Sequence, residues 1–206
     1  FDTEYYLSER EIVGSKTIDL FFYRYKYESH KESPNEQWDK MVRRHLMIHP
    51  IIANLYKVNQ LIPGGGSHCV DMAKDKSGSR DLRGVFSQTQ PHIVFDDKEK
   101  EAGDLFLAKF GLKSDSKFVC LFVRDSAYKK KYQNWKDDWS YHNHRDTKIE
   151  NYELAAYSLV EKGYFVFRMG KVVEEIFGAV HSQILDYANS KYRSDFLDIC
   201  SHCYSI

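Results

Sequence analysis

Phe118-Val119-Cys120-Leu121-Phe122-Val123 is the stretch of sequence that decides the fold. It is a continuous apolar run of strand length, as expected for a strand that is buried on both faces of a sheet. A helical pattern follows at residues 151–162 and stops at Gly163, and a second apolar run occupies residues 164–167. Strand, helix and strand in this order predict a parallel βαβ unit with a right-handed crossover.

The same pattern continues toward the end of the chain. Residues 184–187 read as a third strand, residues 194–203 as a capped helix, and Tyr204 as the start of a fourth strand. We therefore expect residues 113–206 to be the start of a Rossmann-like α/β domain that continues beyond Ile206.

Residues 1–112 are expected to form a second, partial domain with a linker. Its helices are marked by Pro34 with a capping-box glutamate at Glu36, and by glycines that end the helical patterns. Period-two alternation of tyrosines up to Tyr27 indicates a half-buried strand. The expected elements are a strand at 18–22, helices that begin at 33–36, at 51 and at 96, and a turn at 63–66.

The composition excludes several classes of function. The formal net charge of the 206 residues is 0, so nothing draws the chain as a whole to a nucleic acid or to an anionic membrane. The longest apolar run is far shorter than the roughly 18–20 residues of a membrane-spanning helix. Four cysteines are too few for a disulfide scaffold, which favours a reducing, cytoplasmic compartment. The chain starts at Phe1 without a signal sequence, and we expect it to be an internal piece of a longer protein.

Charged and polar residues follow each predicted strand. Arg124 and Asp125 follow the first strand, Arg168 and Gly170 the second, and Tyr187 lies at the end of the third. Because ligands of open α/β sheets bind outside the carboxyl ends of the strands, the two arginines are candidates for a fork that grips a diphosphate. The alternative is that they pair with Asp125 and other nearby acids and only stabilise the fold.

The connection between the first strand and its helix, residues 124–150, is much longer than the usual 2–6 residues. It is rich in aromatic residues and suits recognition of a sugar or a base, although its aromatic side chains can equally pack on one another. We expect this loop to cover the edge of the sheet. Its members with flat or hydrogen-bonding side chains are Tyr128, Tyr132, Trp135, Trp139, Tyr141, His142, His144, Arg145 and Asp146.

Two further patterns are weak signals. Residues His142, His144 and Asp146 alternate as metal ligands can, but Arg145 between them disfavours a cation, and we expect neither a metal nor a cofactor. Cys200 and Cys203 have C-x-x-C spacing at the end of a helix, where a buried pair fits better than a redox motif.

In combination these motifs resemble a family of bacterial glycosyltransferases from surface-polysaccharide gene clusters. The resemblance covers roughly residues 35–206. It rests on the apolar strand with Arg124 to Tyr128, on the stretch from Trp139 to Asp146, and on Gly163 to Gly170. Further matching stretches are 61–65, 78–81, 186–188 and 193–196.

The resemblance implies a metal-independent enzyme of the two-domain GT-B type. Residues 1–112 would then be the acceptor-side domain and residues 113–206 the start of the donor-binding domain. The partners would be a nucleotide-sugar donor and a glycan or lipid-linked acceptor, with no nucleic acid. The location would be the cytoplasm, with peripheral association at the inner face of the membrane compatible with a lipid-linked acceptor.

Within this interpretation each candidate residue has a role. The leaving diphosphate needs positive charge, and a general base must accept the proton of the acceptor hydroxyl. Asp125 is the first candidate for the base, with Asp146 or His144 as the second. The candidates for donor binding are Arg124, Tyr128, Arg145, Arg168, Gly170, Tyr187 and Ser194.

Two alternatives to a glycosyltransferase stay open. One is a nucleotide-sugar epimerase on the same frame, which hydrolysis of the sugar nucleotide without an acceptor would favour. The other is a non-catalytic glycan-binding module, which would have no reason to bind a nucleotide diphosphate.

Overall fold

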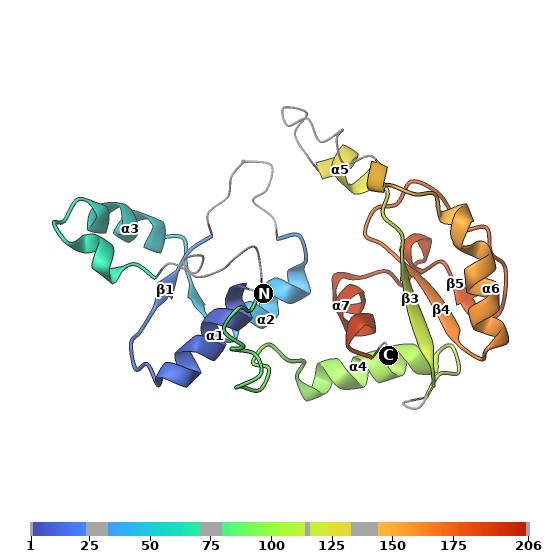
Figure 1. Ribbon diagram of the computed structural model, residues 1–206, viewed down its shortest axis with the longest axis horizontal. Helices are drawn as coiled ribbons and strands as arrows, with labels where there is room; N and C mark the ends of the chain where they lie inside the picture. The colour runs from blue at the N-terminus through green and yellow to red at the C-terminus, as the bar shows by residue number, and fades with distance from the viewer. Residues whose placement is uncertain (1, 24–32, 71–79, 114–115, 133–143, 205–206) are drawn as a thin grey trace. The chain divides into compact units, whose positions relative to one another are not determined.

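The computed structural model describes residues 2–23, 33–70, 80–113, 116–132 and 144–204 (Figure 1). The chain divides into two compact units. Unit 1 comprises residues 1–33 and 38–96, and unit 2 comprises residues 34–37 and 97–206. Whereas the sequence placed residues 97–112 in the N-terminal domain, the structure places them in unit 2.

A parallel sheet forms the centre of unit 2. Its strands are β3 (Phe118–Phe122), β4 (Phe165–Met169) and β5 (Ile184–Leu185), in the order β3-β4-β5. Helix α6 (Glu153–Glu161) connects β3 to β4, as the βαβ pattern predicts. The chain is therefore of mixed α/β class.

Helices lie on both sides of this sheet (Figure 1). On one side, Ala156 of α6 packs with Val166 of β4. On the other side, Phe106 of α4 (Asp97–Ala108) lies against Phe167, with ring centroids 6.0 Å apart. Neighbouring residues of a strand point to opposite faces of the sheet. Val166 therefore faces the layer of α6, and Phe167 faces the layer of α4. Helix α7 (Asp195–Tyr204) contacts α4.

Three details of unit 2 differ from the sequence-based expectation. All five residues of β4 are buried, but in β3 only Phe118 is, and Phe122 is 51% exposed. The reason is that β4 has neighbours on both sides and β3 is an edge strand among the described residues. Tyr204 is the last residue of α7 and does not begin a strand. The connection after β3, which we expected to be a loop, contains a short helix near its start, α5 (Ala127–Tyr132).

Unit 1 contains a two-stranded parallel sheet and short helices. The elements are α1 (Asp2–Val13), β1 (Leu20–Phe21), α2 (Glu36–Arg43, from Trp38 onward), β2 (Met47–Ile48), α3 (Ile52–Gln60) and the 3-10 turn η2 (Gly65–His68). Tyr6, Val42 and Leu46 form its buried cluster, against which Phe21 and Ile48 pack. Helix α1 and strand β2 were not expected. The tyrosine alternation at 24–27 lies outside the described residues.

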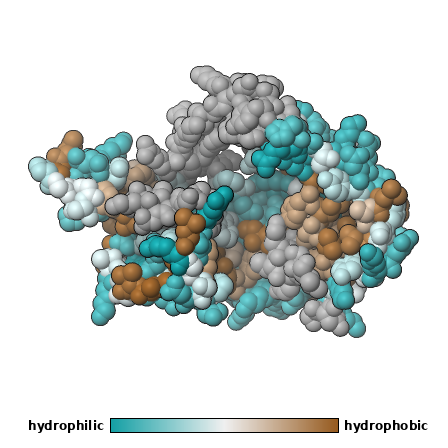
Figure 2. All heavy atoms as spheres, in the orientation of Figure 1, coloured by the Kyte–Doolittle hydropathy of each residue, from teal (hydrophilic) through white to brown (hydrophobic). Residues whose placement is uncertain are grey.

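Exposed apolar side chains are spread over both units. On the face that Figure 2 shows, apolar and hydrophilic side chains are mixed. Leu61, Leu154 and Val180 are each more than 80% exposed. Single exposed apolar residues are common on folded proteins and carry no functional argument. Within the described part of the chain, no helix has the length and apolar character needed to cross a membrane.

Candidate functional site

The candidate site lies where the strands of unit 2 end. In the parallel pair of β3 and β4, Leu121 is the register partner of Arg168 and Phe122 that of Met169. Arg124 follows β3 by two residues. Arg124 and Arg168 are thus at the carboxyl ends of adjacent strands of one sheet, as we expected.

Arg124 is held from one side by an acidic residue 22 positions further along the chain. Its Nε donates to Oδ1 of Asp146 at 3.1 Å, and its carbonyl oxygen accepts the N–H of Thr147 at 3.0 Å. The side chain is 35% exposed. No described residue accepts a hydrogen bond from its two terminal nitrogens. Asp146 therefore orients the guanidinium group through Nε, and among the described residues its terminal nitrogens are not used.

Arg168 has a different environment. It is 1% exposed, and its Nη1 donates to Oδ1 of Asp186 at 3.2 Å. Its Nε is buried and has no hydrogen-bond partner among the described residues. Asp186 also accepts the N–H of Phe177 at 3.0 Å and the side-chain amide of Asn189 at 2.8 Å. Arg168 is therefore part of the buried strand, because β4 runs through Met169, and it does not stand at the surface beside Arg124.

Asp125 connects two loops. Its Oδ1 accepts the N–H of Ala127 at 3.0 Å, at the start of α5, and its Oδ2 accepts the N–H of Glu174 at 2.9 Å. Glu174 also pairs with Lys130, and this hydrogen bond raises the pKa of Lys130. Both oxygens of Asp125 thus bind backbone groups, and this arrangement holds α5 to the loop that follows β4.

Tyr187 and Ser194 stabilise the beginning of α7. The Tyr187 hydroxyl accepts the N–H of Ser194 at 2.9 Å and lies 3.0 Å from Oδ1 of Asp198. Burial raises the pKa of Tyr187. Ser194 Oγ accepts the N–H of Leu197 at 3.2 Å, which is an N-terminal helix cap. Tyr187 is 1% exposed and therefore not accessible to a ligand, whereas Ser194 is partly buried and uses its Oγ for the helix cap.

Gly170 forms the turn directly after β4. Its φ angle is +151°, and a Cβ atom at this position would lie 2.5 Å from Cγ1 of Val173. The turn therefore requires glycine for both its backbone conformation and the space beside it.

The remaining candidates are surface residues. Tyr128, His144 and Arg145 are exposed, and Arg145 has no side-chain partner among the described residues. The side chain of Tyr132, together with Trp135, Trp139, Tyr141 and His142, lies outside the described part of the chain. The described residues contain no group of three or more His, Cys, Asp or Glu side chains able to hold a metal ion. Cys200 is buried, and the Cys203 side chain is not described.

The sequence analysis did not single out three acidic residues that organise the loops around the candidate site, Glu174, Asp186 and Asp195. Asp186 and Glu174 organise the loops around Arg168 and Asp125. Asp195 accepts the N–H of Glu36 at 2.9 Å and pairs with Arg193 at 2.7 Å and with Lys171 at 3.3 Å. The only available signal was position, because Asp186 directly follows β5.

Comparison of the chain with protein-family models, with curated proteins and with solved structures found no match.

Proposed function

We propose that this chain is part of a glycosyltransferase that binds a nucleotide-sugar donor at the carboxyl ends of β3 and β4. The observation that supports the proposal best is the position of Arg124. It follows the end of a parallel strand, where α/β sheets bind ligands. Asp146 holds it through Nε, and its terminal nitrogens have no partner among the described residues. A guanidinium group held in this way suits the bidentate binding of a phosphate group.

In this proposal Arg124 stabilises the negative charge that develops on the leaving diphosphate, without a metal ion. Arg145 directly precedes Asp146 in the sequence, and its exposed guanidinium group adds a second positive charge. Arg168 supports the strand through Asp186 and is no longer assigned to a fork with Arg124. Gly170, Tyr187 and Ser194 shape the surrounding turns, and Tyr128 remains a candidate for donor contact.

The reaction also needs a general base, and the two candidate aspartates differ in how their oxygens are used. Asp125 uses both of its oxygens for backbone N–H groups. Asp146 uses Oδ1 for Arg124, and Oδ2 has no partner among the described residues. We therefore place Asp146 ahead of Asp125 for this role, with exposed His144 as the alternative.

Nucleotide binding tests the proposal. The full-length protein is screened by thermal shift against UDP-, GDP-, dTDP- and CMP-sugars. A donor at about 100 times its Kd adds about 2.7 kcal/mol to the native state. For a folded unit of about 150–250 residues, that corresponds to a shift of about 5–11 °C. We expect one nucleotide class to give such a shift and the others to give none.

A matched pair of variants locates the site. Arg124→Ala should abolish the shift. Arg43→Ala should preserve it, because Arg43 is also partly exposed and also bonds an aspartate, Asp39, through Nε at 2.7 Å, but belongs to unit 1. If no nucleotide sugar stabilises the protein, the enzyme proposal fails and a glycan-binding module is the better reading. Hydrolysis of the donor without an acceptor would instead favour the epimerase.

A further inference from the structure

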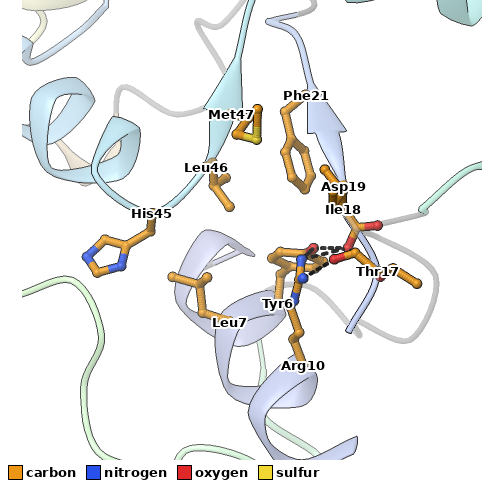
Figure 3. Close-up of a pocket in the computed structure, with 10 residues that line it drawn as sticks. All are labelled: Tyr6, Leu7, Arg10, Thr17, Ile18, Asp19, Phe21, His45, Leu46 and Met47. Carbon is orange, nitrogen blue, oxygen red and sulfur yellow. Dashed lines mark hydrogen bonds and ion pairs between the residues drawn. The ribbon is translucent and has the colours of Figure 1, made fainter. Parts of the chain in front are cut away.

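Unit 1 contains a pocket that is independent of the proposed donor site. Its volume is about 240 Å³, and it lies between α1, β1 and the start of β2 (Figure 3). A water molecule occupies about 30 Å³ of liquid, so the pocket has room for a compound with one ring or a short chain.

Most of the pocket wall is apolar. Leu7, Phe21, Leu46 and Met47 line it together with the ring of Tyr6 (Figure 3). Tyr6 and Leu46 are also part of the buried core of unit 1, so this part of the wall is fixed by packing. Ile18 extends the wall from the loop before β1 and is 80% exposed, and the polar residues Thr17 and His45 also line the pocket. An apolar wall of this kind favours a ligand with an apolar body.

One end of the pocket is polar and has no net charge. The Tyr6 hydroxyl donates to Oδ2 of Asp19, and Arg10 Nη1 donates to the same oxygen at 3.0 Å (Figure 3). Burial and the bond to Asp19 raise the pKa of Tyr6, so its hydroxyl keeps its proton at neutral pH. Asp19 Oδ1 has no partner among the described residues.

The charge balance at this end decides which ligands fit. Asp19 is already neutralised by Arg10, and Arg10 Nη2 also donates to the carbonyl oxygen of Thr17. Because the pair of Asp19 and Arg10 has no net charge, a carboxylate or an ammonium group would lose hydration in the pocket without a net Coulomb gain. A neutral hydroxyl group avoids this penalty and can donate to the open oxygen of Asp19.

We propose that this pocket binds a small neutral compound with an apolar body and a hydroxyl group. The compound is recognised by the apolar wall around Phe21 and by the neutral cluster of Tyr6, Arg10 and Asp19. This inference does not depend on the proposed glycosyltransferase activity, because none of these residues belongs to unit 2.

Three probes of nearly equal shape test the charge argument. Benzyl alcohol, benzoate and benzylamine share one ring and differ in the charge of the head group. Binding to the full-length protein is measured at neutral pH by ligand-observed saturation-transfer NMR. We expect benzyl alcohol to bind with millimolar Kd and the two charged probes to bind at least about 10-fold more weakly, which corresponds to about 1.4 kcal/mol. Equal binding of all three, stronger binding of a charged probe, or no binding would each overturn the proposal.

A second pair of variants shows whether the binding occurs in this pocket. Ile18→Asp places a charge in the apolar wall and should weaken benzyl alcohol binding at least about 10-fold. Val13→Asp is the matched control, since Val13 is 78% exposed and does not line the pocket. Both positions are exposed, so both variants should fold, as circular dichroism will verify. Equal affinity of the two variants would place the binding elsewhere and refute the site.

Discussion

Arg124 and Arg168 are the same residue type at the ends of neighbouring strands, but they have different environments. Arg124 is partly exposed and bonded to Asp146, whereas Arg168 is buried and bonded to Asp186. The sequence placed both arginines at the carboxyl ends of adjacent strands, but it expected Arg168 after its strand, whereas Arg168 lies within β4. The sequence did not separate their roles, because each partner lies 22 or 18 residues away and reaches the arginine only through the fold.

The exposed arginine should matter for turnover. If Arg124 acts mainly in the transition state, Arg124→Ala should lower turnover by about 10²- to 10³-fold. Donor binding should fall less, and Arg124→Lys should rescue poorly because a point charge does not reproduce a bidentate contact. Turnover per folded molecule and the melting temperature are measured together. Near-normal turnover with a lower melting temperature would make Arg124 a structural partner of Asp146.

The buried arginine should matter for stability. Arg168→Ala leaves the largely buried carboxylate of Asp186 without its cation, and removal of one partner of a buried ion pair costs about 3–5 kcal/mol. Lys148→Ala is the control. Its ion pair with Glu150 is more than 60% exposed on both sides, and such pairs contribute about 0–1 kcal/mol. Urea unfolding of both variants gives the comparison, and similar losses would show that Arg168 is not paired as described.

At the scale of elements, predictions succeeded where local signals and packing agree. Helix α4 has acidic residues in its first turn and is followed by Gly111, which has a φ angle of +72°, and the sequence marks both ends. Helix α1 has the same end signals, an acidic first turn and Gly14 with a φ angle of +63°, but its buried residues are Tyr5, Tyr6 and Ser8, which form no apolar pattern that the sequence reveals. Strand β4 ends at Met169, two residues later than the expected strand at 164–167, since burial of Arg168 depends on its partner Asp186, which no local pattern reveals.

The turn after β4 provides a test at this scale. Gly170→Ala should destabilise unit 2 by more than the roughly 1 kcal/mol expected from positive φ alone, because the new Cβ would lie 2.5 Å from Val173. Gly163→Ala is the matched control, since Gly163 has a φ angle of +83° but no atom within 4 Å of a Cβ. Adding Val173→Ala should recover part of the Gly170→Ala loss. Equal losses at the two glycines would show that contact with Val173 is unimportant.

At the scale of the whole molecule, the sequence predicted a mixed α/β chain in two parts. It placed the boundary near residue 112, and the structure divides the units at residue 96. The difference arises from Phe106 and Phe110, which pack against Phe167 of the sheet with ring centroids 6.0 and 5.9 Å apart. Helix α4 thus directly follows unit 1 in the sequence but belongs to the core of unit 2. Its apolar pattern alone does not show which of the two cores it joins.

Each unit contains a carboxylate whose pKa is lowered in the folded state. For Glu4 in unit 1, desolvation acts to raise the pKa, but hydrogen bonds from the backbone of His92 and Ile93 outweigh it. For Asp195 in unit 2, desolvation is likewise outweighed by the N–H of Glu36 and by Arg193 and Lys171. A lowered folded pKa stabilises the native state above the unfolded value, and this contribution is lost as pH falls through the folded pKa.

Both units should therefore lose stability on acidification. The loss begins near the unfolded pKa values, 4.5 for Glu4 and 3.8 for Asp195, and continues below them. Hydrogen exchange between pH 6 and pH 3, corrected for the intrinsic exchange rate and read separately in α1 and α7, measures each unit. Glu4→Gln should flatten the pH dependence in α1 and leave that of α7 unchanged, and Asp195→Asn should do the reverse. If either variant flattened both profiles equally, the two units would unfold together, and the carboxylates would not report on separate cores.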